Sequence, residues 1–387
     1  MRPFQFSSRT EVAYGIQRVS SIGEDIARLG GGSKVVLVTD PGLVALGVAE
    51  QVSEHIRQAG IEVLLFSNVA SDPSAASIDE AAAIIRESNV TCVIGLGGGS
   101  AMDVAKMAAL TAGDQQPAEH YALMANPFQP KKIASIMIPT TSGTGAEVTS
   151  TVVFSTKEKR KVWGWDASMA PELAVLDPSL TVALPPHLTA ATGLDALVHA
   201  MEAMTGKRQN AMIEALSLQA IQLISANLPR VLLQPDDLDA RGALSIGAML
   251  AGMAIEQGGT GIAHCIGHAL GTLGRIHHGR AVAIALYTAY EWNVAGDVAA
   301  HAKIARALGA QGESAEELAY AGGQRFRQLV EESGIKLSLQ EDGLSKLDED
   351  RFVETMQAEE NAPMRRNNCR ETTEEDLRRF ARAILAY

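Results

Sequence analysis

The chain has 387 residues, of which 47% are hydrophobic and 20% are charged, with a mean hydropathy of +0.05. This length suits two domains of ordinary size, and the composition excludes a disordered or fibrous chain. The 33 Lys and Arg residues against 45 Asp and Glu residues give a net charge of −12, which opposes binding to phosphate backbones and anionic lipids. We therefore expect neither a nucleic acid nor a membrane as a partner.

The cysteines indicate a reducing compartment. Cys92, Cys265 and Cys369 are far apart in the sequence and form no CxxC pair, so they suit neither a disulfide framework nor a structural zinc site. The first ten residues hold no apolar block like that of a signal peptide, and no apolar run of about 18 residues occurs. We expect a cytoplasmic protein.

The first half of the chain has the pattern of an α/β domain. Short β-branched runs bounded by turn residues predict buried strands. The predicted strands are Lys34–Thr39, Ile61–Phe66, Thr91–Leu96, Ile133–Ile138 and Leu173–Leu176. Segments with helical spacing lie between strands, among them Leu43–Gln58 and Ile78–Glu87. This alternation predicts a mostly parallel sheet of the kind that binds nucleotides.

After Pro185 and Pro186 the apolar residues recur with a period near 3.6, and no alternating strand pattern remains. We therefore expect an α/β nucleotide-binding domain over residues 1–185 and an all-helical domain over residues 186–387. Within the second domain, Thr373 with Asp376 predicts a capping box at a helix start, and the polar segment Asn361–Asn368 predicts a loop.

A glycine-rich turn is the first candidate binding element. Gly97, Gly98, Gly99 and Ser100 stand between a predicted strand and a helical run, where free N–H groups and the helix dipole suit a pyrophosphate. The alternative is a tight turn capped by Ser100, with Asp103 completing the cap. Three consecutive glycines favour phosphate binding, because a cap alone does not require them.

Two other segments follow predicted strands. Asp40 could accept hydrogen bonds from a ribose and repel a 2′-phosphate, although a helix N-cap is the alternative role. Residues 140–145, including Thr140, Thr141 and Thr144, supply hydroxyls and flexible backbone that could surround a phosphate or a ribose, with a plain polar loop as the alternative. The glycine turn is not a Rossmann fingerprint, because Ser100 stands at the sixth position of the Gly-x-Gly-x-x-Gly pattern.

Histidines cluster in the second half. Four of the nine lie in the segment His264–His278, and two pairs spaced i, i+4 occur, Asp195 with His199 and His264 with His268. Such pairs share one helix face and could converge on one divalent cation. Neutral imidazoles with one carboxylate suit Fe²⁺ or Zn²⁺ better than Mg²⁺ or Ca²⁺. We predict four metal ligands, which are Asp195, His199, His264 and His278. Isolated core or surface histidines are the alternative, and the clustering argues against it.

Four motifs together resemble the iron-containing (group III) alcohol dehydrogenase family over nearly the whole chain. They are Gly97–Ser100 with Asp103, Pro139–Glu147, Thr192–His199 and His264–Gly279. The resemblance implies a dehydroquinate synthase-like fold, with an N-terminal domain for NAD(P) and a C-terminal domain that holds the metal.

The resemblance also assigns individual residues. Asp195, His199, His264 and His278 match the metal ligands, and His268 matches a further histidine near substrate and nicotinamide. Asp40 matches the adenosine-ribose position, Gly97–Ser100 the pyrophosphate turn, and Thr140, Thr141, Thr144 and Lys161 positions around the cofactor. The family often has proline where His277 stands, which leaves His277 or His278 open as the ligand, and the following Gly279 favours His278.

The implied reaction is hydride transfer between nicotinamide C4 and a small alcohol or aldehyde, with His268 passing the proton. Arg275 and Arg280 flank His278, so the substrate could carry an anionic group, unless acidic neighbours hold these arginines. The alternatives are a glycerol dehydrogenase-like or dehydroquinate synthase-like enzyme, and a non-catalytic protein that binds metal or nucleotide. NAD or NADP and Fe²⁺ or Zn²⁺ remain open, and we expect a homo-oligomer, with a dimer favoured.

Overall fold

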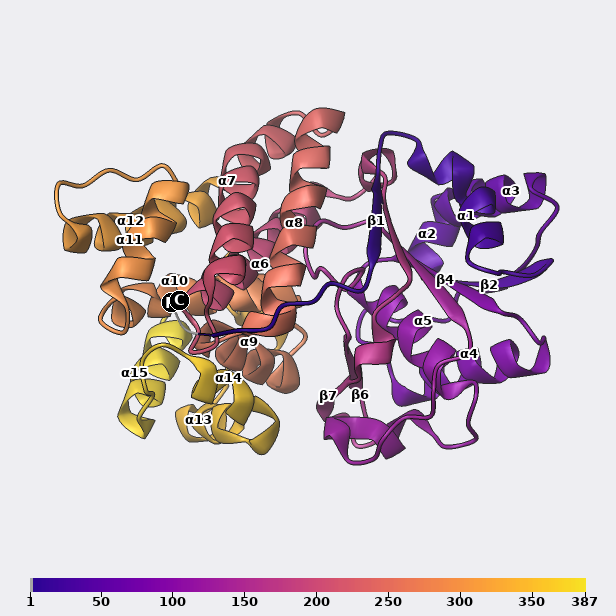
Figure 1. Ribbon diagram of the computed structural model, residues 1–387. Helices are drawn as coiled ribbons and strands as arrows, with labels where there is room; N and C mark the ends of the chain where they lie inside the picture. The colour runs from indigo at the N-terminus through magenta and orange to yellow at the C-terminus, as the bar shows by residue number, and fades with distance from the viewer. Residues whose placement is uncertain (1–2) are drawn as a thin grey trace. The chain divides into compact units, whose positions relative to one another are not determined.

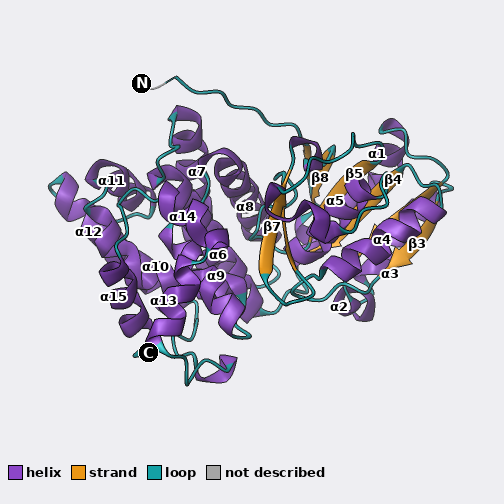
Figure 2. Cartoon of the chain, turned by 90° about the horizontal axis from the view of Figure 1, so that it is seen from below, coloured by secondary structure: helices purple, strands orange, loops and turns teal. Residues whose placement is uncertain are grey.

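The structure, a computed structural model, describes residues 3–387. It contains an α/β unit of residues 7–141 and 145–184 and a helical unit of residues 3–6, 142–144 and 185–387. Figure 1 labels the elements of both units. Figure 2 shows that strands and helices alternate in the α/β unit, whereas the helical unit contains helices and loops.

The α/β unit is built on a six-stranded parallel sheet with the order β1-β8-β5-β4-β2-β3. The strands are β1 (Glu11–Tyr14), β2 (Lys34–Val38), β3 (Glu62–Phe66), β4 (Cys92–Gly97), β5 (Ala134–Pro139) and β8 (Leu173–Leu176). All five predicted strands are confirmed. The sequence analysis missed β1, a short strand at the edge of the sheet.

Helices cover both faces of this sheet. Alternate residues of β2 point to opposite cores: Val36 and Val38 pack with α4 and α5, while Val35 and Leu37 pack with α1 and α3. The helices are α1 (Ile22–Arg28), α2 (Pro41–Ala45), α3 (Val48–Gln58), α4 (Ala75–Glu87) and α5 (Gly99–Thr111).

Two predictions in this unit need correction. The segment Leu43–Gln58 is two helices and not one, because Gly47 adopts a left-handed conformation with φ of 76° and ends α2. The region after the Thr-rich loop forms an antiparallel hairpin of β6 (Thr151–Ser155) and β7 (Lys161–Trp165), which the sequence analysis did not predict.

The helical unit confirms the prediction of an all-α C-terminal region. One large core joins its helices. They are α6 (Pro186–Thr205), α7 (Ala211–Leu233), α8 (Leu238–Gly258), α9 (Ile262–Leu273), α10 (His278–Val294), α11 (Val298–Ala307), α12 (Ala315–Glu332), α13 (Glu349–Gln357), α14 (Ala362–Asn367) and α15 (Glu374–Leu385). The capping box of Thr373 and Asp376 at the start of α15 is confirmed. The loop predicted at Asn361–Asn368 is wrong, because α14 occupies most of it and Asn367 and Asn368 are buried.

Helices α7 and α8 are long and apolar enough to cross a membrane by length and composition alone. They pack against each other and against α6, and the most apolar window is 44% buried in α7 and 61% buried in α8. The core helices of a soluble protein pass the same test.

A buried ion pair links α5 to the hairpin. Lys106 is fully buried, and its Nζ lies 3.1 Å from Asp103 Oδ1 and donates to the carbonyl oxygen of Thr151 over 2.7 Å. Asp103 Oδ2 accepts the N–H of Val153 at 2.9 Å. The pair therefore holds β6 against the helix that follows the glycine-rich turn.

Replacing the buried lysine tests this role. Lys106→Met leaves the Asp103 carboxylate buried without its partner, and we expect the free energy of unfolding to fall by about 3 kcal/mol or more. Lys34→Met, which breaks a surface pair with Glu62, serves as the control and should cost less than about 1 kcal/mol. Urea denaturation measures both. Equal effects in the two variants would contradict the structural role.

Candidate metal centre and cofactor turn

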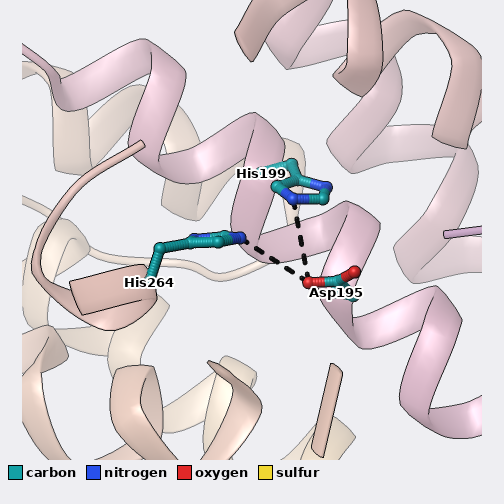
Figure 3. Close-up of side chains that lie close together, drawn as sticks. All are labelled: Asp195, His199 and His264. Carbon is teal, nitrogen blue, oxygen red and sulfur yellow. Dashed lines mark ion pairs between the residues drawn. The ribbon is translucent and has the colours of Figure 1, made fainter. Parts of the chain in front are cut away.

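Four predicted ligands come together inside the helical unit. Asp195 and His199 lie one turn apart on α6, His264 lies in the first turn of α9, and His278 is the first residue of α10. The Nε2 atoms of His199, His264 and His278 lie 3.8, 3.7 and 3.8 Å from Asp195 Oδ1. Figure 3 shows Asp195, His199 and His264, with the two ion pairs that join them.

The donor atoms of this cluster suit a divalent cation. Asp195 Oδ1 and His264 Nε2 are buried and find no hydrogen-bond partner among residues 3–387, which is costly unless another group satisfies them. Ligands at about 2.1 Å from a tetrahedral ion stand about 3.4 Å apart, slightly closer than the separations seen here. Two or three imidazoles with one carboxylate also match the donor chemistry of Fe²⁺ and Zn²⁺. Asp195, His199 and His264 alone already form a buried group able to hold a metal ion.

Burial and neighbouring charges set the protonation of these groups. Burial lowers the pKa of His199 to about 4, against the opposing charge of Asp195, so this ring is neutral at pH 7. Burial opposes ionisation of Asp195, but the neighbouring His199 and His278 outweigh it and hold the pKa of the carboxyl well below its usual range. Burial also disfavours charge on His264, yet Glu202 and Asp195 raise its pKa to about 9. Bound cation would replace the proton that these carboxylates attract.

The structure also places the other two histidines of the cluster. The ring centroid of His268 lies 5.2 Å from that of His278 and 6.3 Å from that of His264, so His268 is a neighbour of the ligand rings. His277 is exposed, whereas His278 reaches Asp195. The geometry thus favours His278 over His277 as the member of the cluster.

Glu202 is a functional candidate that the sequence analysis missed. Its Oε2 lies 2.5 Å from His264 Nδ1, and its carboxylate also accepts the N–H groups of Gly261 and Ala263. The spacing did hold a signal, since Asp195, His199 and Glu202 stand at i, i+4 and i+7 and therefore share one face of α6.

Close packing of helices brings the ligands together. A Cβ at Gly279 would lie 2.2 Å from the carbonyl oxygen of Ala191, so only glycine allows the start of α10 to approach α6 this closely. Gly143 likewise packs on Thr192, where a Cβ would lie 2.7 Å from the threonine Cβ. Residues 142–144 therefore belong to the helical unit, and Thr144 lies there with them.

Asp40, the glycine turn, Thr140 and Thr141 lie at the carboxyl ends of β2, β4 and β5 in the α/β unit. The chain runs outward from β2 to β3 on one side and from β4 to β5 on the other, so the strand order reverses between β2 and β4. Ligands bind at such a switch point in open α/β sheets. Asp40 follows β2 and the glycine turn follows β4, and a Cβ at Gly97 would lie 3.5 Å from Asp40 Oδ2.

The turn itself is shaped for close approach. Gly97 has φ of +148°, a conformation that side chains rarely adopt. Thr140 N–H donates to the Gly97 carbonyl, and a Cβ at Gly98 would contact Thr141. Helix α5 begins at Gly99 with Gly98 as its N-cap, and no side chain caps it. Its first N–H groups are thus suited to a phosphate.

Of the two alternative helix-cap roles, the structure shows that of Asp40 and not that of Ser100 with Asp103. Asp40 does cap α2, since Oδ1 accepts from Gly42 and Leu43, which leaves Oδ2 beside the turn. The predicted cap by Ser100 and Asp103 is wrong, because Ser100 Oγ donates to the Ser71 carbonyl and Asp103 pairs with Lys106. A direct role of Asp103 in cofactor binding therefore has no support from its contacts.

Lys161 and Arg280 are placed as follows. Lys161 begins β7, opposite Ser155 in the hairpin, and not in the turn. Arg280 binds both oxygens of Asp342 at 2.8 Å and donates to the carbonyls of Lys336 and Ser338. The structure thus favours an arginine held by an acidic neighbour over one that recognises an anionic substrate. Arg275 is exposed, and its backbone N–H donates to the Asp342 carbonyl.

Comparisons with known proteins agree with this architecture. Residues 9–178 match the family described as iron-containing alcohol dehydrogenase, and residues 189–385 match the C-terminal part of the Fe-containing alcohol dehydrogenase family. The chain belongs to the iron-containing alcohol dehydrogenase family. It is therefore an NAD(P)-linked, metal-dependent oxidoreductase that acts on CH–OH groups, and the alternatives of a dehydroquinate synthase-like or non-catalytic protein are not favoured.

Individual relatives of this dehydrogenase span most of its length. A choline dehydrogenase of Bacillus subtilis is 34% identical over 345 residues, which are 88% of this chain and 85% of the relative. An NAD-dependent methanol dehydrogenase of Bacillus methanolicus is 32% identical over 75% of this chain and 76% of its own length. The crystal structure of a 1,3-propanediol oxidoreductase matches with a TM-score of 0.93 and 30% identity, covering 99% of this chain and 100% of that one.

The glycine contact at α10 gives a test of the centre. Gly279→Ala must separate α10 from α6, so we expect lower metal content together with a stability loss of about 1–3 kcal/mol, the usual cost of overpacking. Gly271→Ala on α9 is a matched control, because a Cβ there meets nothing within 4 Å, and it should add about 0.5–1 kcal/mol without changing metal content. Elemental analysis and thermal melts measure both. Full metal content in the Gly279 variant would contradict the packing argument.

Proposed function

We propose that this dehydrogenase interconverts a short, uncharged alcohol and its aldehyde. In this proposal residues 1–185 bind NAD(H), and residues 186–387 hold one Fe²⁺ or Zn²⁺ through Asp195, His199, His264 and His278. The observation that carries the proposal is the set of three Nε2 atoms within 3.8 Å of one carboxylate oxygen. The commitment of Arg280 to Asp342 supports the choice of an uncharged substrate.

The ligand set determines what the centre offers to a substrate. Three neutral rings and one carboxylate cancel half of a divalent charge, and a bound cation would act there as a Lewis acid toward the substrate oxygen. The buried position of Asp195, His199 and His264 keeps water from competing for that charge.

The cofactor turn provides the other half of the reaction. We assign the pyrophosphate to the N–H groups at Gly98–Ser100 and the adenosine ribose to Asp40, and the nicotinamide would accept or deliver the hydride. The Asp40 carboxylate would repel a 2′-phosphate, which supports NAD over NADP. Thr140, Thr141, Thr144 and Lys161 keep their proposed places around the cofactor.

His268 is the proposed proton carrier. Its ring centroid lies 6.3 Å from that of His264 and 5.2 Å from that of His278, and imidazole is the side chain that most often serves as a general acid or base. It would hold the hydroxyl proton and pass it toward solvent as the carbinol carbon loses hydride.

The location and assembly of the protein are also proposals. Cys92, Cys265 and Cys369 are all free thiols, which supports a reducing, cytoplasmic location. We expect a homodimer, and sedimentation velocity is the direct measurement.

Paired histidine variants test the proposed function. His278→Ala removes a ligand and should lose metal and activity together. His268→Ala should keep its metal while kcat for aldehyde reduction falls about 100-fold or more, the usual size of a general acid–base contribution. Metal analysis and NADH oxidation with butyraldehyde measure the two properties. Loss of metal in the His268 variant would show that the ligand assignment is wrong.

Cofactor choice has its own test. Asp40→Asn keeps an acceptor oxygen for the cap of α2 but removes the charge, so we expect the ratio of kcat/KM for NADH over NADPH to fall about tenfold, which corresponds to about 1.4 kcal/mol. Steady-state kinetics with both cofactors give the ratio, and a thermal melt controls for the cap. An unchanged ratio would remove Asp40 from the ribose site.

A further inference from the structure

Glu202 has a buried carboxylate whose hydrogen bonds to described residues lie at the start of α9. The residue is 3% exposed. Its Oε2 accepts the N–H of Gly261 at 2.9 Å and faces His264 Nδ1 at 2.5 Å, while Oε1 accepts the N–H of Ala263 at 2.6 Å. A carboxylate that receives two backbone N–H groups is an acceptor only, so the contact with His264 requires the proton on Nδ1.

The proton on Nδ1 of His264 determines the state of Nε2 on the opposite side of the ring. With the proton on Nδ1, the neutral ring presents the lone pair of Nε2. This atom lies 3.7 Å from Asp195 Oδ1 and has no hydrogen-bond partner among the described residues. We propose that Glu202 is a positioning residue that fixes the tautomer and the orientation of His264 and thereby sets the metal affinity of the centre. This inference rests on the proposed role of His264 as a ligand.

The same carboxylate also takes the place of an N-cap. Gly261 precedes α9 and has no side chain to cap it, so Glu202 and Asn368 accept the N–H groups of the first residues instead. A Cβ at Gly261 would lie 2.8 Å from Asn368 Oδ1 and 3.0 Å from Glu202 Oε1. Glu202 therefore contacts both the ring of His264 and the backbone at the start of the helix that carries it.

Asn368 supplies a matched control, because it caps the same helix without touching a ligand ring. Its Oδ1 accepts the N–H of Ile262 at 3.2 Å, and its Nδ2 donates to Asn293. A variant of Asn368 therefore reports what a weaker cap does alone, and a variant of Glu202 reports the cap and the ring together.

The experiment compares Glu202→Gln, Asn368→Ala and His264→Ala in the full chain. Metal is removed by chelation, and the dissociation constant for Zn²⁺ is measured on folded protein by competition with a chromophoric chelator. We expect Glu202→Gln to weaken Zn²⁺ binding about 10–100-fold, as loss of a carboxylate partner does at other histidine ligands. Asn368→Ala should lower the Tm of the metal-free protein without changing the Zn²⁺ constant.

A spectroscopic readout covers the case in which Glu202→Gln does not fold. In wild-type protein loaded with Zn²⁺, ¹⁵N-histidine NMR should show His264 protonated at Nδ1. Protonation of His264 at Nε2, or no bound Nδ1 proton, would overturn the inference whatever the variants do.

The remaining outcomes separate the two levels of the argument. If Glu202→Gln binds Zn²⁺ as wild type does, or no more weakly than Asn368→Ala, then Glu202 is only a helix cap and the inference fails while the proposed function stands. If His264→Ala itself binds Zn²⁺ normally, the proposed ligand set is wrong, and the inference falls with it.

Discussion

The interior of the helical unit contains a carboxylate oxygen and an imidazole nitrogen whose burial is unfavourable. Asp195 Oδ1 and the Nε2 atom of His264 are buried and close together, and the described part of the chain offers neither a hydrogen-bond partner. Each unsatisfied group of this kind costs about 1–3 kcal/mol. Folding alone gives no reason to tolerate such an arrangement. In the proposed metal site, a cation bound among these atoms would remove this penalty.

The constraint extends outward through the packing. Gly279 lets α10 approach α6, Gly143 lets the loop of residues 142–144 settle on Thr192, and Gly261 leaves room for the carboxylate of Glu202. Each glycine is present because a neighbouring backbone or polar side chain occupies the space of a Cβ. The α/β unit uses the same device at Gly97, where a positive φ opens the turn beside Asp40.

Much of this was predictable from the sequence, and the exceptions have physical reasons. Continuous β-branched runs marked the buried strands, and the i, i+4 pairs marked the residues that the structure brings together around Asp195. Edge strand β1 was missed because it has only four residues and its first and last residues are exposed. The hairpin β6–β7 was missed although β6 is apolar and largely buried. The asparagines near α14 predicted a loop because they are polar. They are buried because their amides bind backbone groups of distant segments such as Gly258. Single-sequence periodicity cannot show such long-range contacts.

Helix α6 carries Asp195, His199 and Glu202 on one face, and this limits insertions and deletions within the helix. One residue inserted or deleted between Asp195 and Glu202 turns everything beyond it by about 100°, so a single such event would take these residues off their shared face. An insertion in the exposed turn at residues 311–313 would leave that register intact. Among homologous chains, gaps should therefore accumulate in such turns, and α6 should keep a constant length even where its apolar side chains drift.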